Sequence, residues 1–404
     1  MAVPAFRRLW IAGIVSDAGD WLMFIALPLV VLRLSQSALG TSFAFVLELA
    51  PTVLLAPVAA RLVDLLPRRE LMVAATLAQA ASLLPLLAVH DRFQLPLVYC
   101  VIVAQATFAT VFEPAKNAVL PTLVGPERTV SANAFVGLNN DLGRLIGGPL
   151  GGVLLATVAL GGVTLVDLAT YLVAAAFVAT LPKRGEPRAA SGGAARPSRG
   201  GIRRAFADPA VRDPLAVAFV ASVAQGLFIV LFVFFVTTVI GRSATDVGVL
   251  RGVQAIGAIT AGVLLGTVGA RVPVLRLTQI GVASFAVLTA VIWNLSFLTH
   301  GVTVYGFLFA AAGAPAVLMS TGLISVLQSA SSDAQRGSTF AALGLSQATG
   351  QAIGLLLAGG LLEIVGTMAL LEIQAATYAV AAVLTLTLLP RRRANERARP
   401  TRQV

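Results

Sequence analysis

Charged side chains interrupt the long apolar runs of this sequence, and their spacing indicates where chemistry could occur. Asp17 and Asp20 stand three residues apart in the first run, which places both on one face of a helix. Glu48 lies in the second run and Glu113 near the end of the fourth. An ionisable group at bilayer depth costs at least a few kcal/mol, so such residues usually serve a function. We therefore take Asp20, Glu48, Asp17 and Glu113 as candidates for taking up and releasing a proton.

A second set of polar and aromatic residues could line a cavity that holds a substrate. Arg144 could hold an anionic group, but Asp141 stands one turn away and the two could simply satisfy each other. Asp167 and Arg251 fall nearer the expected outer surface, where a gate or interface role is the alternative. The candidates for the substrate cavity are Arg144, Asp141, Asn140, Phe24, Gln225, Gln254, Gln347 and Gln351.

Composition excludes several classes of protein. Apolar residues make up 57% of the 404 residues and charged residues only 12%, too few to cover a soluble fold. Two histidines and one cysteine provide no metal-ligand cluster, and we expect no metal and no cofactor. The chain has no Gly-x-Ser-x-Gly, His-Glu-x-x-His or phosphate-binding loop, so we do not expect an enzyme or an ATP-driven pump.

The apolar runs are long enough to cross a bilayer, which takes about 20 residues. They predict an all-α membrane protein with twelve transmembrane helices. The expected spans are roughly 9–32, 40–66, 70–90, 95–118, 129–157, 160–181, 213–240, 245–269, 272–292, 300–327, 336–362 and 366–389.

The basic residues indicate the orientation in the membrane rather than a nucleic-acid partner. With a cytoplasmic N-terminus, 24 of the 29 Lys and Arg residues fall on the cytoplasmic side, which predicts that both termini are inside. We expect a six-helix bundle over 1–181, a cytoplasmic linker over 182–213, a second six-helix bundle over 214–390 and a basic cytoplasmic tail over 391–404. Within the linker, Ile202–Val211 could form a short basic amphipathic helix on the inner leaflet, or be a plain tether.

The two predicted bundles share a weak sequence repeat. Val119–Leu155 matches Val326–Leu362 without a gap, at an offset of 207 residues, with thirteen identities in 37 positions. Many secondary transporters are built from two such copies, with the substrate between them. The copies differ in charge, since Arg144 corresponds to Gln351 and Asp20 to Leu227. We therefore expect ion coupling in the first copy and hydrogen-bonding substrate contacts in the second.

The segment Ala60-Arg-Leu-Val-Asp64-Leu-Leu-Pro-Arg68-Arg69 resembles the signature loop of the major facilitator superfamily (MFS), Gly-x-x-x-Asp-Arg-x-Gly-Arg-Arg. Asp64, Arg68 and Arg69 are retained, whereas positions 60, 65 and 67 depart from the pattern. The resemblance implies the MFS fold of two pseudo-symmetric six-helix bundles. It also implies that Asp64, Arg68 and Arg69 form a cytoplasmic gate.

A glycine-rich stretch is similar to the Gly-Pro-x-x-Gly-Gly motif of exporters in this superfamily. It comprises Gly147, Gly148, Pro149, Gly151 and Gly152, with the proline one place late. The alternative is tight helix packing without a role in transport. Further segments resemble the twelve-span drug-efflux and siderophore-export branch: Phe6–Trp10, Gly19–Trp21, Ala26–Pro28, Glu48–Pro51, Glu113–Lys116, Leu120–Pro121, Ala132–Ala134 and Asp333–Gly337. The arginine that many proton-coupled relatives carry in the fourth span is missing.

Together these features predict a secondary active transporter, a proton-coupled antiporter that exports amphipathic small molecules in the manner of multidrug efflux. The alternatives are an exporter or flippase of a lipid-like or siderophore substrate, and a sensor or scaffold without transport. The expected partners are a small-molecule substrate, protons and the lipid bilayer, with no nucleic acid. The expected form is a monomer in the prokaryotic inner membrane.

Overall fold

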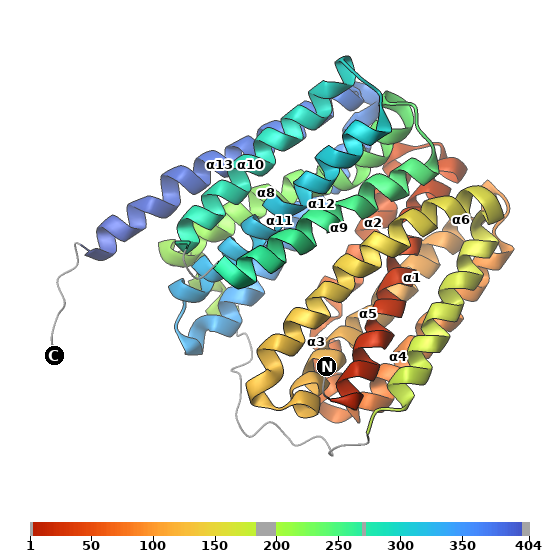
Figure 1. Ribbon diagram of the computed structural model, residues 1–404, viewed down its shortest axis with the longest axis horizontal. Coiled ribbons are helices and arrows are strands. Elements are labelled where there is room, and N and C mark those ends of the chain that lie inside the picture. The colour runs from red at the N-terminus through yellow and green to blue at the C-terminus, as the bar shows by residue number, and fades with distance from the viewer. Residues whose placement is uncertain (1–2, 183–198, 269–271, 398–404) are drawn as a thin grey trace. The chain divides into compact units, whose positions relative to one another are not determined.

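Long apolar helices form almost the whole of this protein, whose computed structural model describes residues 3–182, 199–268 and 272–397 (Figure 1). Proline at the first helical positions begins several of them, as at Pro4 and Pro209, because its fixed φ suits that place. The helices are α1 (Pro4–Ser35), α2 (Ala38–Leu54), α3 (Ala56–Leu65), α4 (Arg68–Leu83), α5 (Leu95–Val124), α6 (Thr129–Ala179), α7 (Arg199–Ala207), α8 (Pro209–Phe234), α9 (Ala244–Val268), α10 (Val274–Asn294), α11 (Val302–Ala330), α12 (Asp333–Val365) and α13 (Thr367–Arg397).

Ten of the described helices are long and apolar enough to cross a membrane, or eleven when α2 and α3 count as one span bent by 49°. The all-helical class expected from the sequence is confirmed. The expected spans 129–157 and 160–181 share the label α6 but lie on either side of a break in its helical backbone at Ala159. Of the expected linker and tail, residues 183–198 and 398–404 lie outside the described residues, and α13 continues to Arg397.

Helix α6 reverses direction at Ala159, whose φ of 53° and ψ of −170° interrupt the helical backbone. Gly147 packs against Ala18 of α1, and the side chain of Asp167 packs against the neighbouring Gly19. A straight helix would separate residues 147 and 167 by about 30 Å, so both can reach the same turn of α1 only if α6 doubles back. Figure 1 shows this reversal between the yellow and yellow-green arms of α6. We call Thr129–Val158 the first arm and Leu160–Ala179 the second arm.

The described chain divides into two compact units. The first contains α1 to α6 together with Val236–Ile256, and the second contains α7, α8 and the part of the chain from Gly257 onward. In the first unit, α1 packs against the first arm of α6 through Gly143, Gly147 and Gly151. An ideal Cβ on Gly151 would lie 2.6 Å from the carbonyl oxygen of Leu22, so only glycine allows this approach.

The second unit repeats this packing at the positions that the 207-residue offset predicts. Gly350 and Gly354 of α12 correspond to Gly143 and Gly147, and both pack against the backbone of α8. A Cβ on Gly350 would lie 2.5 Å from the carbonyl oxygen of Phe219. The glycines of the repeat therefore have a physical reason, which is the close contact of two helices in each unit.

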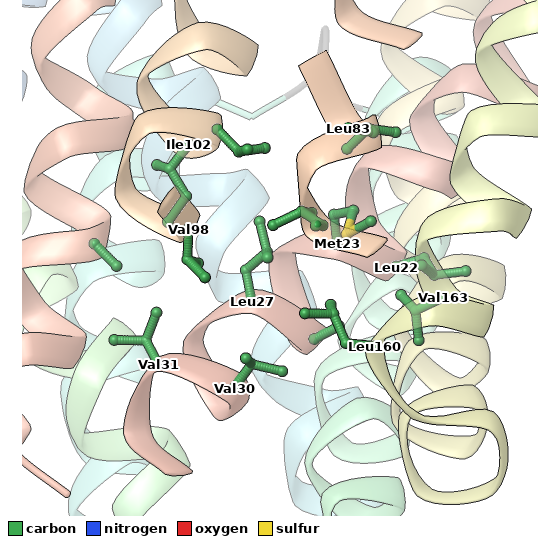
Figure 2. Packing of buried hydrophobic residues seen from close by; sticks show 14 of the residues in the cluster. Leu22, Met23, Leu27, Val30, Val31, Leu83, Val98, Ile102, Leu160 and Val163 are labelled. Carbon is green, nitrogen blue, oxygen red and sulfur yellow. The ribbon is translucent and has the colours of Figure 1, made fainter. Parts of the chain in front are cut away.

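Apolar side chains from α1, α2, α4, α5 and α6 form one of the buried clusters of the first unit (Figure 2). Leu22, Leu27 and Val30 of α1 meet Leu83 of α4 and Val98 of α5, all of them buried. Leu160 and Val163 bring the second arm of α6 into the same cluster. This core fixes α1 between α4, α5 and α6.

The linker helix α7 ends at Ala207, earlier than the sequence suggested. The side chain of Asp208 caps the next helix by accepting a hydrogen bond from the Ala210 amide at 2.9 Å, so residues from Pro209 onward belong to α8. Ala205 is buried in a cluster with Leu215 and Leu343 of the second unit. Ala205 and Ile202 of α7 therefore pack against α8 and α12, whereas Phe206 stays exposed.

Candidate functional site

A cavity of about 220 Å³ lies within the first unit, between α1, α2, α4, α5 and the second arm of α6. It adjoins the apolar core, and Met23, Leu27 and Ile102 contribute to both. Three carboxyl groups, two amides, one phenol and two phenyl rings supply the rest of its chemistry. These residues are Asp20, Glu48, Asp167, Gln79, Gln105, Tyr171, Phe24 and Phe45.

Tyr171 is the centre of a hydrogen-bond network in the cavity wall. Its hydroxyl donates to the Oδ1 atom of Asp20, and the Nε2 atom of Gln79 donates to it at 3.2 Å. The Oε1 atom of Gln105 is a second acceptor for the same hydroxyl at 3.2 Å, and Gln105 Nε2 donates to the Gln79 carbonyl at 3.0 Å. Since a hydroxyl has one proton, Asp20 and Gln105 compete for it.

Asp167 lies in the same cavity, 1% exposed, and its carboxylate accepts a hydrogen bond from Thr170 Oγ1 at 3.0 Å. It occupies the space beside Gly19, which has no side chain to exclude it. The sequence placed Asp167 near the outer surface and Asp20 near mid-depth. The structure instead brings both residues into one cavity, with Asp167 against Gly19, the neighbour of Asp20.

Glu48 differs from the other two carboxyl groups. It is exposed to the cavity, and among the described residues it has no hydrogen bond or ion pair. Phe24 and Phe45 lie in the same wall with ring centroids 5.6 Å apart. The cavity thus combines an unpaired carboxylate with an aromatic surface.

A second polar cluster surrounds Trp21 in the first unit. Arg144 Nη2 pairs with Asp141 Oδ1 at 2.7 Å, and the Arg144 guanidinium carbon lies 5.6 Å from the Trp21 ring centroid. The guanidinium carbon of Arg251 lies 5.6 Å from the same centroid and 5.8 Å from that of Phe24. Arg251 Nη1 also donates to Gln254 Oε1 at 2.9 Å. Two cationic groups therefore lie on one aromatic residue, where cation–π attraction favours them.

The remaining candidates occupy different places. Glu113 pairs with the buried Lys116 at 2.6 Å, and both act electrostatically on Asp17, which lies against Gly143. Asn140 is exposed on the first arm of α6. In the second unit Gln225 accepts a hydrogen bond from Tyr378 at 3.2 Å. Gln347 is exposed and Gln351 half-buried, both on α12.

The two arginines of the expected gate motif donate hydrogen bonds to helix carbonyls of the first unit. Arg68 Nη1 donates to the Ala118 carbonyl of α5 at 3.0 Å, and Arg69 donates to the carbonyl of Ala179, the last residue of α6. The carbonyl of Ala179 has no partner within its own helix, so an arginine stabilises it. Asp64 is exposed. The structure thus gives Arg68 and Arg69 a role in holding α4, α5 and α6 together.

The exporter-type glycine motif packs on two sides. Gly147 and Gly151 contact α1, as described above. Gly148 and Gly152 face the start of α9, where a Cβ on Gly148 would lie 3.0 Å from the Gly248 carbonyl and one on Gly152 2.8 Å from the Thr245 Cα. Tight helix packing was one interpretation of the motif, and the structure shows such packing both against α1 and against the start of α9.

Sequence analysis missed Gln79, Gln105 and Tyr171, although the repeat contained a signal for the tyrosine. The 207-residue offset maps Thr170-Tyr171 onto Thr377-Tyr378, and the two tyrosine hydroxyls donate to polar side chains of α1 and α8 respectively. The matching tyrosines lie beyond Val119–Leu155 and Val326–Leu362, the two segments in which the repeat was recognised.

The geometry can be compared with known proteins. The sequence profile of the Major Facilitator Superfamily matches residues 9–331. The chain belongs to this superfamily. The superfamily expected from the signature loop is therefore confirmed, and with its ten or eleven candidate spans the chain is a multi-pass membrane protein.

Individual relatives are distant. The uncharacterized MFS-type transporter YfiS of Bacillus subtilis is 26% identical over 190 residues. These residues are 45% of this chain and 45% of that protein, so the match spans less than half of either.

Solved structures show a similar fold. A bacterial homologue of the iron transporter ferroportin, inward-facing, is 17% identical with a TM-score of 0.74, covering 95% of this chain and 98% of that one. A mutant of the nucleoside transporter NupG is 11% identical with a TM-score of 0.76, covering 95% and 99%. A bacterial homologue of the human lysosomal transporter Spinster, inward-facing and unoccupied, is 16% identical with a TM-score of 0.67, covering 95% and 97%. At these identities the likeness concerns the fold alone.

Proposed function

We propose that this protein is a proton-coupled exporter of amphipathic small molecules that works by alternating access. The observation that carries the proposal is the carboxylate of Asp20, which lines the cavity of the first unit and accepts a hydrogen bond from Tyr171. An ionisable group in a membrane-spanning helix usually belongs to a transport or proton pathway. The apolar and aromatic lining suits an amphipathic substrate.

The hydrogen-bond network offers a way for a proton to change the protein. A proton from water in the cavity would bind the Asp20 carboxylate and remove its negative charge. The neutral acid is a weaker acceptor, so the hydroxyl proton of Tyr171 could turn to Gln105 instead. The change would alter the contact of α1 with α5 and with the second arm of α6, and release of the proton would restore it.

The proposal includes an arrangement in the membrane. The offset of 207 maps Ala159, the break in α6, onto Gly366, which separates α12 from α13 with a φ of 86°. By this correspondence the two arms of α6 would cross the membrane separately, giving twelve crossings. The halves 1–181 and 214–390 would be the two moving bundles, with 182–213 and the tail 391–404 in the cytoplasm.

The finer assignments follow from the sequence. The segments around Asp20, Glu48 and Glu113 resemble the drug-efflux and siderophore-export branch, which supports assignment to that branch. The asymmetry of basic residues favours a prokaryotic inner-membrane protein with both termini inside. We expect the monomer to be the transporting form.

Purified protein in proteoliposomes tests the proposal. A pH-sensitive dye inside the vesicles would report proton movement when ethidium or another amphipathic drug is added to one side. We expect drug-dependent proton flux in the native protein and none in Asp20→Asn, with drug exchange retained in the variant. Absence of drug-dependent proton flux across a panel of drugs, with the protein folded and correctly inserted, would refute proton-coupled export.

A second candidate is an exporter or flippase of a substrate with an anionic group, such as a lipid-like molecule or a siderophore. The position of Arg144 and Arg251 on the ring of Trp21 favours it. Two guanidinium groups can bind a phosphate or carboxylate with bidentate geometry. Competition of ethidium transport by a lysophospholipid or a catecholate siderophore, lost in Arg144→Gln, would support this candidate.

A further inference from the structure

We infer that the cavity of the first unit binds an organic cation with an aromatic or apolar body, and that Glu48 holds its positive group while Asp20 carries the proton. This inference rests on the proposed function and deepens it, because it names the substrate class and divides the two carboxyl groups between two tasks.

The charge of the wall selects the class of ligand. Three of the lining residues carry carboxyl groups, Asp20, Glu48 and Asp167, and they come from α1, α2 and α6. The described residues that line the cavity include no lysine, arginine or histidine, although the guanidinium carbon of Arg251 lies 5.8 Å from the ring centroid of Phe24, one of the lining residues. Like charges in an apolar surrounding repel one another strongly, since water screens them little. A cation relieves that repulsion, whereas an anion would add to it.

The hydrogen bonds separate the tasks of the three acids. The carboxylate of Asp20 is held by Tyr171 and that of Asp167 by Thr170. Glu48 is exposed to the cavity and has no such partner among the described side chains. A ligand can therefore reach Glu48 without breaking a hydrogen bond of the protein. Binding at Asp20 would instead compete with Tyr171.

The rest of the wall fits the body of such a cation. Phe24 and Phe45 form an aromatic surface, and Met23, Leu27 and Ile102 are apolar. Aromatic faces attract alkylammonium groups at about 0.5 to 2 kcal/mol. A bare metal ion fits less well, because the described residues contain no group of three or more His, Cys, Asp or Glu placed to hold one.

Equilibrium binding of a matched series of compounds tests the inference. Benzyltrimethylammonium has a phenyl ring and a fixed positive charge, neopentylbenzene has the same shape without charge, and benzylphosphonate carries negative charge. Radiolabelled benzyltrimethylammonium would be bound to detergent-solubilised protein and displaced by each compound. We expect displacement by unlabelled cation and at least about tenfold weaker displacement by the other two, equivalent to about 1.4 kcal/mol.

The variants assign the residues. Glu48→Gln should weaken binding of the cation about tenfold or more, whereas Glu48→Asp, which keeps the charge, should retain part of it. Asp20→Asn should weaken binding of the cation less than Glu48→Gln does, because it removes one charge of the wall but not the carboxylate that holds the ligand. Glu70→Gln is the matched control, because it removes one exposed carboxylate outside the cavity and should change nothing. Each variant would be checked for a native thermal transition before binding is compared.

The outcomes separate this inference from the proposed function. Equal binding of the neutral compound, or unchanged binding in Glu48→Gln, would overturn the cation site even if drug-dependent proton flux were observed. Loss of binding in Asp20→Asn as large as that in Glu48→Gln would overturn the division of tasks. Selective cation binding that depends on Glu48, in a protein without proton flux, would uphold the site and refute the export proposal.

Discussion

The hydroxyl of Tyr171 donates a hydrogen bond to the carboxylate of Asp20 and so joins the second arm of α6 to α1 inside the cavity. Tyr171→Phe removes this donor and leaves the ring. A hydrogen bond to a charged group contributes about 1.5–3 kcal/mol, so we expect the proton-driven rate of drug transport to fall about tenfold or more. Drug exchange without a pH gradient should persist. Both rates can be measured in the same proteoliposomes.

Tyr378→Phe is the control for this prediction. Tyr378 corresponds to Tyr171 in the repeat, but its hydroxyl donates to the amide of Gln225 at 3.2 Å rather than to a carboxylate. We expect proton-driven transport in Tyr378→Phe to stay near the native rate. An equal loss in both variants would show that the tyrosines serve packing and not proton coupling.

The glycines of the repeat predict a pattern of stability. Gly147→Ala and Gly354→Ala place a methyl group against the backbone of α1 and α8 respectively, and such overpacking costs about 1–3 kcal/mol. Gly137→Ala and Gly344→Ala stand ten residues earlier in the same helices, where nothing lies within 4 Å of the new methyl group. These two should be neutral or stabilising, since alanine favours helix. Thermal unfolding in detergent would compare the four variants. Similar unfolding midpoints in all four variants would contradict the close helix contacts at Gly147 and Gly354.

Part of this structure could be predicted from the sequence because apolar runs of membrane length determine helices directly. The positions of α1, α5 and α12 followed from such runs. The contacts between helices could not be predicted in this way, because an apolar run shows that a helix is buried but not which other helix packs against it. Asp20 was recognised from its charge, whereas Gln79 and Gln105 are uncharged residues that matter only because α4 and α5 bring them to Tyr171. The meeting of Asp167 and Asp20 in one cavity was missed for the same reason.

The break in α6 gives a further prediction, because Ala159 has a backbone conformation that favours glycine. Its φ is 53° with ψ at −170°, a region that costs a residue with a Cβ about 1–3 kcal/mol. Ala159→Gly should therefore raise the thermal unfolding midpoint, by the equivalent of about 1 kcal/mol. Gly366→Ala, at the matching position of the second copy with a φ of 86°, should lower it. Its new methyl group would meet nothing within 4 Å, so the loss would come from the backbone alone. A midpoint that falls in Ala159→Gly would contradict the assigned conformation.

The contribution of the ion pair between Asp141 and Arg144 to the free energy of unfolding can be measured with single and double variants. The side chains are 24% and 16% exposed, so removing one charge leaves the other largely buried and unpaired. We expect Asp141→Asn and Arg144→Gln each to destabilise the protein by about 1–3 kcal/mol. This cost is lower than that of breaking a fully buried ion pair, because water still reaches both groups. The double variant should lose less than the sum, because it leaves no lone charge. Unfolding midpoints in detergent of the native protein, the two single variants and the double variant give the coupling energy between the two side chains.

Arg144→Lys adds a separate test of the contact with Trp21, since lysine keeps the charge but lacks the planar group that stacks on an indole. If Arg144→Lys were as stable as the native protein and the two single losses were additive, neither the ion pair nor the stacking would contribute to stability. The arginine would then be available for a substrate with an anionic group.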